Sequence, residues 1–291
     1  MVTRKEKISM KKIFTGLLCC AALLSSATLS AEIVIKNGDK IAFLGDSITA
    51  QGDIFSCGYI NLVMSALKIN GVNAQKVPAG RGGNKSYHML ARLERDVLSK
   101  KPQYMTLSCG VNDVWHGKRG VPLDKYKVDI TKIVEKAQAA GIKVYILTAT
   151  MIGEDQKSKT NQKLIAYNDF LRQLAKEKNC VLVDLNKDMQ EFVASIKKKY
   201  PKLKNCIATY DGVHMNPMGN IVMARGLLKA FGLTGEQIAK CEADWNKRHF
   251  PLYKMFDFTV SEYKKLSDIA FATGKDVPSY IKSLVNKDLK K

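Results

Sequence analysis

The sequence of 291 residues is poor in residues that would indicate several specialised classes of protein. Its 7 cysteines lack the spacing of a disulfide framework, and no Cys-x-x-Cys pair occurs. A His-Glu-x-x-His motif is also missing, so the sequence predicts neither a metal site nor a cofactor. Internal repeats with a period of about 20–50 residues are not visible, which argues against solenoids and propellers.

Acidic residues are the other scarce group. The chain has 27 Asp and Glu against 47 Lys and Arg, which gives a formal net charge of +20. Such an excess attracts anionic polymers or cell surfaces. The densest basic run comprises Lys197, Lys198, Lys199, Lys202 and Lys204. A solvated face is its simplest interpretation and attraction to an anionic polysaccharide is the alternative. We expect no nucleic-acid partner.

The first 31 residues have the composition of an export signal. Basic residues precede an apolar run over residues 13–24, and small residues follow as far as Ala31. The apolar run is too short for a comfortable membrane span. The segment predicts a signal peptide, residues 1–31, with cleavage after Ala27 as the alternative. We therefore expect a periplasmic or secreted protein without stable membrane insertion. A lipid anchor is less favoured, because small residues do not precede Cys19 or Cys20.

Short apolar runs alternate with helical patterns from residue 40 onward. The runs predict strands at residues 40–44, 72–78, 104–109, 142–149 and 180–184. Apolar residues at helical spacing predict helices at residues 60–67, 90–97, 123–137 and 164–174. This alternation indicates an α/β protein with a parallel sheet covered on both faces. Active sites of such proteins lie beyond the carboxyl ends of the strands.

Four segments in the expected crevice carry residues suited to catalysis. They are Gly45-Asp46-Ser47, the glycine cluster Gly80 to Asn84, Gly110-Val111-Asn112-Asp113, and Asp211-Gly212-Val213-His214. The last segment precedes Asn216 and Pro217, which suit the cap and first position of a helix. Each segment alone is ordinary turn chemistry. Their joint occurrence in this order is hard to explain by chance.

Together the four segments resemble the blocks of the SGNH hydrolases, also called the GDSL esterase/lipase family. The resemblance covers about residues 38–233 and includes Leu90-Ala-Arg-Leu93, which follows the glycine cluster. It implies a flavodoxin-like three-layer α/β/α fold with five parallel strands in the order 2-1-3-4-5. We therefore expect a hydrolase domain at residues 32–233. Residues 234–291 would form a C-terminal helical extension, with helices at 234–245 and 261–272.

The resemblance also implies a role for each block. Ser47 would be the nucleophile, His214 its base, and Asp211 the carboxylate that orients the histidine ring. The backbone N–H groups of Ser47 and Gly83 and the side-chain amide of Asn112 would form the oxyanion hole.

Further polar and aromatic residues lie close to these blocks in the sequence. Asp46, Asn84 and His116 are candidates for substrate binding. Tyr59 and Cys57 suit either the cleft wall or the core, whereas His88 and His249 are expected to be structural.

These expectations favour a secreted serine esterase that cleaves carboxylic esters, above all O-acetyl groups on carbohydrate. Its partner would be a small-molecule or polysaccharide ester. A lysophospholipase or acyl-thioesterase is the nearest alternative, although no long lid segment of lipase type is evident. A non-catalytic carbohydrate-binding protein with the same fold is the second alternative. It is less favoured because a binding module has no need for an intact nucleophile, acid and base.

Overall fold

The computed structural model of the protein describes residues 32–252 and 256–288. The predicted signal peptide lies outside these residues. The sheet contains β1 (Lys40–Gly45), β2 (Gln75–Gly80), β3 (Tyr104–Ser108), β4 (Lys143–Leu147) and β5 (Val181–Val183). All neighbouring pairs are parallel, and the strand order is 2-1-3-4-5, which confirms the expected topology. The carboxyl ends of all five strands therefore meet at one edge.

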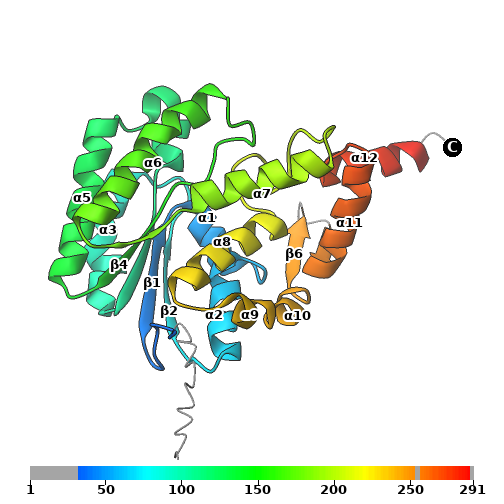
Figure 1. The fold of residues 1–291 in the computed structure, drawn as a ribbon. Coiled ribbons are helices and arrows are strands. Elements are labelled where there is room, and N and C mark those ends of the chain that lie inside the picture. The colour runs from blue at the N-terminus through cyan, green and yellow to red at the C-terminus, as the bar shows by residue number, and fades with distance from the viewer. Residues whose placement is uncertain (1–31, 253–255, 289–291) are drawn as a thin grey trace, which may run out of the picture. The chain divides into compact units, whose positions relative to one another are not determined.

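Helices cover both faces of this sheet (Figure 1). One layer contains α1 (Ser47–Ile54), α2 (Tyr59–Ile69), α7 (Leu185–Lys199) and α8 (Pro217–Ala230). The opposite layer contains α3 (Ser86–Asp96), α5 (Leu123–Ala139) and α6 (Lys159–Glu177). Three short helices connect these elements: η1 (Leu98–Lys100), α4 (Val111–Trp115) and η2 (Gly117–Arg119). The result is the expected three-layer α/β/α fold.

The central strands are apolar along almost their whole length because helices bury both of their faces. Residues 41–44 of β1 and residues 145–147 of β4 are fully buried. The edge strand β2 is more exposed and contains Pro78, which an edge strand tolerates because one of its sides needs no ladder hydrogen bonds. Periodicity therefore located each strand, although β2 starts three residues later than expected.

Two helices of the sheet layers were not predicted from the sequence. The first, α1, begins directly at Ser47, and the Asp46 side chain caps it by accepting from Ile48 N. The second, α7, is capped by Asp184, whose side chain accepts from Lys187 N. The basic run at Lys197–Lys199 forms the last turn of α7, where positive charge is favoured by the helix dipole.

The segment after residue 233 is more varied than the expected helical extension. It contains α9 (Gly235–Ala239), α10 (Glu242–Trp245), β6 (His249–Leu252), β7 (Phe256–Thr259), α11 (Val260–Ala272) and α12 (Val277–Asp288). Helix α11 agrees with the prediction, but the helix expected at 234–245 is divided into α9 and α10. The antiparallel pair of β6 and β7 was missed, because alternation over four residues is too short to recognise. In Figure 1 this segment lies beyond α8, on the side away from the sheet.

Cysteines and membrane-spanning potential can be checked for the described residues. The five cysteines there are all free thiols. Among these residues, no helix has the length and apolar character needed to cross a membrane.

Candidate active site

Ser47, His214 and Asp211 form one chain of hydrogen bonds at the carboxyl edge of the sheet. His214 Nε2 lies 2.8 Å from Ser47 Oγ, and His214 Nδ1 lies 2.6 Å from Asp211 Oδ2. Ser47 and His214 are 167 residues apart in sequence, so only the fold brings them together. Three groups hydrogen-bonded in this way can serve as a nucleophile, its base and a carboxylate that orients the base.

The environment of Asp211 keeps its carboxyl group charged. Burial would raise the pKa of this group, but hydrogen bonds from the His214 ring and from two backbone N–H groups outweigh it. The backbone donors are Val213 N and His214 N, at 3.0 and 2.8 Å from Oδ1. The net result is a pKa below the ordinary value for aspartate. An anion in this place can hold Nδ1–H of the ring and stabilise the imidazolium form.

The loop that carries Asp211 and His214 is tightly folded. Tyr210 N donates to His214 O at 3.0 Å, and Gly153 N donates to Gly212 O at 2.7 Å. Gly212 has φ +93°, a conformation that favours glycine. The loop ends at Asn216, whose side chain caps α8 ahead of Pro217, as the sequence predicted.

Asn112 links the loops that follow the first three strands. It lies in α4 and is 3% exposed. Its Nδ2 donates to Asn84 O at 3.1 Å and lies 3.4 Å from Asp46 Oδ2. Gly83, directly before Asn84, has φ +70°, a backbone conformation that favours glycine. A Cβ atom at this position would meet no other atom within 4 Å, so lack of space is not the reason for glycine here. The three predicted oxyanion donors therefore belong to segments that are joined at this edge.

The three candidates for substrate binding have different surroundings. Asp46 is 2% exposed, and burial raises its pKa to about 6 although Ile48 N–H donates to it. The Asn84 side chain accepts from Arg92 Nε at 2.7 Å, so part of its polar surface is already occupied. His116 caps the end of α4 and is half-buried, and burial with nearby Lys85 lowers its pKa. Of the three, only Asp46 is buried, whereas Asn84 and His116 are each partly exposed.

The remaining aromatic and histidine candidates have structural roles. Tyr59 and Cys57 are fully buried, and Tyr59 OH donates to Thr49 Oγ1 at 3.1 Å, so both belong to the core and the cleft-wall interpretation is wrong. His88 Nδ1 accepts from Lys85 N at the start of α3. His249 Nδ1 lies 3.1 Å from Asp257 Oδ2 across the pair β6–β7.

Sequence reasoning did not recognise Arg92 as part of this region. The Arg92 side chain is 6% exposed. Its Nη2 donates to Gly45 O at 2.8 Å, its Nε donates to Asn84 Oδ1 at 2.7 Å, and its Nη1 pairs with Asp96 at 3.0 Å. One guanidinium thus joins the segment before Ser47 to the segment after Gly83. The pattern Leu90-Ala-Arg-Leu93 was the available signal, but it did not indicate these partners.

Glu154 was also missed, and nothing in the sequence pattern indicates it. Its carboxylate is 3% exposed and accepts from three consecutive backbone N–H groups. The donors are Ile207, Ala208 and Thr209, at 2.8, 2.8 and 2.9 Å. The Thr209 hydroxyl adds a fourth bond at 2.9 Å. Glu154 therefore fixes residues 207–209, which lead into Asp211 and His214.

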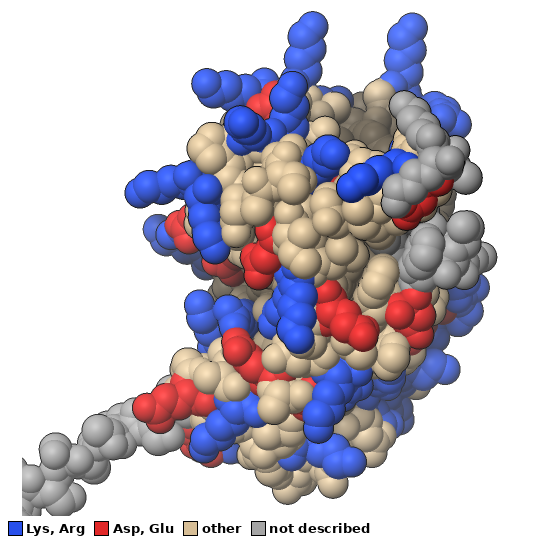
Figure 2. All heavy atoms as spheres, turned by 90° about the vertical axis from the view of Figure 1, so that its right-hand side faces the viewer, with Lys and Arg blue, Asp and Glu red and all other residues tan. Residues whose placement is uncertain are grey.

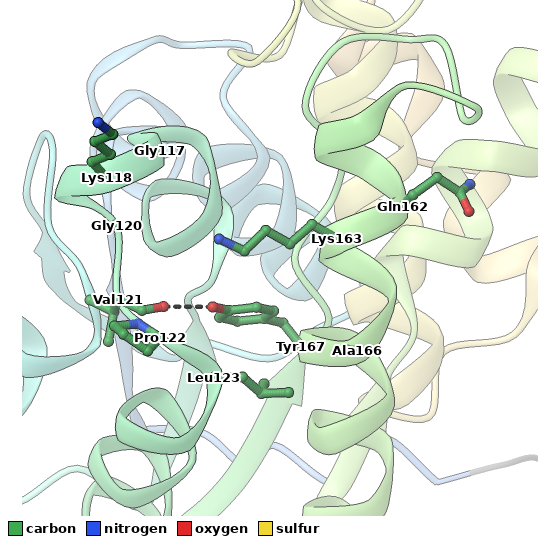
Figure 3. A pocket seen from close by; sticks show the side chains of 10 residues that line it. All are labelled: Gly117, Lys118, Gly120, Val121, Pro122, Leu123, Gln162, Lys163, Ala166 and Tyr167. Atoms are coloured by element: carbon green, nitrogen blue, oxygen red, sulfur yellow. Dashed lines mark hydrogen bonds between the residues drawn. The ribbon is translucent and has the colours of Figure 1, made fainter.

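A pocket of about 630 Å³ is lined by residues of the segments 117–123 and 162–167, none of which belongs to the candidate site. Figure 3 shows it between the α4–α5 connection and α6, with Lys163 extending across it. The Tyr167 hydroxyl donates to Val121 O at 2.5 Å at the pocket wall. The described residues contain no group of three or more His, Cys, Asp or Glu side chains placed to hold a metal ion. Hydrogen bonding rather than this pocket therefore defines the candidate site.

Comparison with known proteins places the chain in a family. Residues 43–220 match the GDSL-like lipase/acylhydrolase family, so the chain belongs to it. It is therefore a carboxylic ester hydrolase with the SGNH fold, as the four blocks indicated. The crystal structure of an acetyl xylan esterase, AlAXEase, is 38% identical with a TM-score of 0.62. That alignment covers 66% of this chain and 98% of the other.

Two curated relatives are also similar. An acetylxylan esterase of Geobacillus stearothermophilus is 26% identical over 68% of this chain and 96% of its own length. Esterase TesA of Pseudomonas aeruginosa is 29% identical over 44% of this chain and 60% of its own length. Structures of the Geobacillus enzyme include catalytic mutants in which a serine, an aspartate and a histidine are each replaced by alanine. In that enzyme the aspartate precedes the histidine by three positions.

Proposed function

We propose that the protein is a secreted serine esterase that removes O-acetyl groups from carbohydrate. The observation that carries this proposal is the contact of 2.8 Å between His214 Nε2 and Ser47 Oγ, with Asp211 on the other ring nitrogen. The similar acetylxylan esterases support acetylated polysaccharide as the substrate class. The spacing of aspartate and histidine in the Geobacillus enzyme supports the same roles for Asp211 and His214.

In the proposed reaction, Ser47 Oγ attacks the acetyl carbon while His214 Nε2 takes the hydroxyl proton. The histidine then gives this proton to the departing sugar oxygen, leaving an acetyl-enzyme. A water molecule, deprotonated by His214, attacks the acetyl-enzyme in turn and releases acetate and free Ser47. Asp211 stabilises the imidazolium in both halves. No cofactor takes part.

The tetrahedral intermediates would be stabilised by Ser47 N–H, Gly83 N–H and the Asn112 amide. Asn112 is held for this task because one bond of its Nδ2 is to Asn84 O. Its second contact, to Asp46, is long at 3.4 Å, so one N–H can turn to a developing oxyanion.

We further propose that residues 1–31 direct export and that residues 32–233 form the hydrolase domain, with residues 234–291 as its extension. A polysaccharide outside the cytoplasm is a fitting partner for an exported enzyme. A lipid anchor is the alternative mode of localisation, and the chain is 24% identical to an uncharacterised lipoprotein of Bacillus subtilis over 53% of its length. Mass spectrometry of the exported protein distinguishes a free N-terminus from a lipidated one.

The first test is hydrolysis of p-nitrophenyl acetate by the parent and by Ser47→Ala. We expect the variant to lose activity by at least ~10³, because the remaining groups cannot form an acyl-enzyme. Ser99→Ala is the control, since Ser99 is exposed and its hydroxyl only bonds Arg95 O. A folded parent that hydrolyses no ester would favour the carbohydrate-binding alternative instead.

A second test concerns the acyl chain. We expect acetyl and butyryl esters to have higher kcat/KM than long-chain esters, and acetylated xylo-oligosaccharides to be deacetylated. A panel of p-nitrophenyl esters, acetylated sugars, lysophospholipids and acyl thioesters measures this preference. Faster turnover of long acyl chains would move the assignment to a lysophospholipase or thioesterase.

A further inference from the structure

An aromatic contact connects the candidate catalytic histidine to the C-terminal segment. The Tyr210 ring lies over the His214 ring, with 5.9 Å between centroids and 20° between planes. Phe250 of β6 contacts the same Tyr210 ring, at 5.9 Å and 52°. The Tyr210 hydroxyl donates to Gln51 Oε1 at 3.2 Å, which fixes its outer end to α1. Tyr210 is thus held between His214 and Phe250 of the hairpin, which is the antiparallel pair of β6 and β7.

Phe250 is itself firmly placed. It is 2% exposed and makes edge-to-face contacts with Phe55 at 5.8 Å and Tyr263 at 5.6 Å. Next to it, His249 N donates to Ser56 Oγ at 2.8 Å, and the same hydroxyl lies 3.1 Å from His249 O. The strand β6 is therefore attached to the segment that follows α1, rather than lying loosely on the surface.

The β6–β7 pair lies beyond the residues that the family model matches. The family match ends at residue 220, and two thirds of this chain covers 98% of AlAXEase. Phe250 therefore contacts the histidine loop from outside the residues that the family model matches.

The stacked contact restrains the histidine in a direction that its hydrogen bonds leave weak. The bonds at Nδ1 and Nε2 lie in the plane of the imidazole ring, so they resist displacement within that plane. Tilting of the ring out of plane is resisted by groups that contact its face, and Tyr210 is such a group. A misplacement of about 1 Å can cost about 10²-fold in rate, so this restraint has catalytic consequences.

We propose that Phe250, acting through Tyr210, is a positioning residue for His214, and that the C-terminal extension thereby forms part of the active site. This proposal rests on the proposed function of His214 as the base. The extension supplies this support from beyond residues 43–220, which the family model matches, and its removal would leave the ring less well aligned on Ser47.

The kinetic test compares Phe250→Ala with a matched control in the same extension. Phe271→Ala is that control, because Phe271 is buried in α11 and contacts Tyr200 instead of Tyr210. We expect both variants to lower Tm, but only Phe250→Ala to lower kcat, by about 10-fold with KM changed less than about 2-fold. Phe250→Leu, which keeps most of the volume, should fold well and have intermediate kcat. Equal losses of kcat in Phe250→Ala and Phe271→Ala, or parental kcat in Phe250→Ala, would overturn the proposal.

A spectroscopic test does not depend on turnover. The chain has 4 histidines, so the imidazole N–H proton signals are few and His214 is assigned by its loss in His214→Gln. In a Ser47→Ala background, Phe250→Ala should shift or broaden the low-field signal of the N–H bonded to Asp211, and Phe271→Ala should leave it unchanged. An unchanged signal in Phe250→Ala contradicts the positioning role. Inactivity of the parent, by contrast, would refute the proposed function and leave this measurement valid.

Discussion

The pKa values of two aspartates in this site are shifted in opposite directions. Asp211 has a lowered pKa because hydrogen bonds from His214 and the backbone outweigh its burial. Asp46 has a pKa raised to about 6, mainly because it is buried, although it accepts a bond from Ile48 N–H. Burial and donors both contribute to the difference. Asp46 is 2% exposed, whereas the Asp211 side chain is 39% exposed. Asp211 also receives three hydrogen bonds, while Asp46 accepts from Ile48 N–H and has a long contact to Asn112.

The raised pKa of Asp46 predicts a pH-dependent cost to folding. In the unfolded chain the group titrates near 3.8, and in the folded chain near 6, so the folded state binds more protons between these values. Stability from the protonated carboxyl is therefore present below pH 4 and lost as the pH rises through 6. Asp46→Asn keeps an acceptor for Ile48 N–H without a charge to bury. We expect its stability relative to the parent to increase between pH 4 and pH 7, by at most about 3 kcal/mol.

Urea unfolding of the parent and of Asp46→Asn at both pH values measures this difference. Titration of other groups cancels in the comparison, because both proteins contain them. A stability difference that is the same at pH 4 and pH 7 would show that burial does not perturb this carboxyl.

At the scale of elements, helix α3 connects the loops of the candidate site through hydrogen bonds of one side chain. Its buried Arg92 bonds Gly45 O at the end of β1 and the Asn84 side chain beyond β2. Asn84 O in turn accepts from Asn112 beyond β3. The segments that follow β1, β2 and β3 are thus connected through the Arg92 guanidinium and through Asn84.

Replacing Arg92 should therefore disturb oxyanion stabilisation. A lysine cannot reproduce the forked donors, so Arg92→Lys should lower kcat by about 10–100-fold through misplaced backbone donors. Arg95→Lys is the matched control: Arg95 also pairs with Asp96, at 2.6 Å, but its side chain is 68% exposed and its hydrogen bonds go to Asp96. We expect it to have nearly parental kcat.

Thionoester substrates make this test specific, because sulfur accepts hydrogen bonds poorly. The parent should prefer oxygen esters strongly, and Arg92→Lys should lose much of that preference. If Arg92→Lys and Arg95→Lys had the same kcat and the same preference, the connection between the loops would be unimportant for catalysis.

At the scale of the whole molecule, the chain has more basic than acidic residues, with 47 Lys and Arg against 27 Asp and Glu. Figure 2 shows Lys and Arg side chains projecting around the face formed by the C-terminal elements, with fewer Asp and Glu among them. Lys197 is partly withdrawn, since its Nζ donates to Glu154 O at 2.9 Å. A positive field of this kind raises the local concentration of anionic substrates.

This field predicts a dependence on salt that distinguishes substrates by their charge. On an acetylated polysaccharide with uronic acid groups, kcat/KM should fall several-fold between ionic strengths of about 0.01 and 0.15 M, as the Debye length shrinks from about 30 to 8 Å. Hydrolysis of neutral p-nitrophenyl acetate in the same buffers is the control and should change little. The same salt response for both substrates would mean that surface charge does not assist substrate capture.

The sequence by itself determined the class of fold and pointed to the residues of the candidate site. The spacing of apolar residues in strands and helices is a local property. The sequence of residues 40–184 therefore predicted alternating strands and helices and, from them, a parallel α/β fold. The resemblance of the four blocks supplied the strand order, and their positions after strands brought Ser47, Asn112 and His214 to one edge. Asn216 and Pro217 were readable too, because helix capping depends on neighbours in sequence.

Only the tertiary structure decided what holds these residues in place. Arg92 and Gly45 are 47 residues apart, Glu154 and Ala208 are 54 apart, and Phe250 reaches Tyr210 from a hairpin too short to recognise. Such contacts obey no fixed spacing, because the chain can close loops of any length at little additional cost. Their partners are backbone groups and ring faces, which every sequence offers in many places. Short motifs in the sequence therefore indicate the candidate site residues. The positions of their side chains relative to one another depend on long-range contacts that form only when the chain folds.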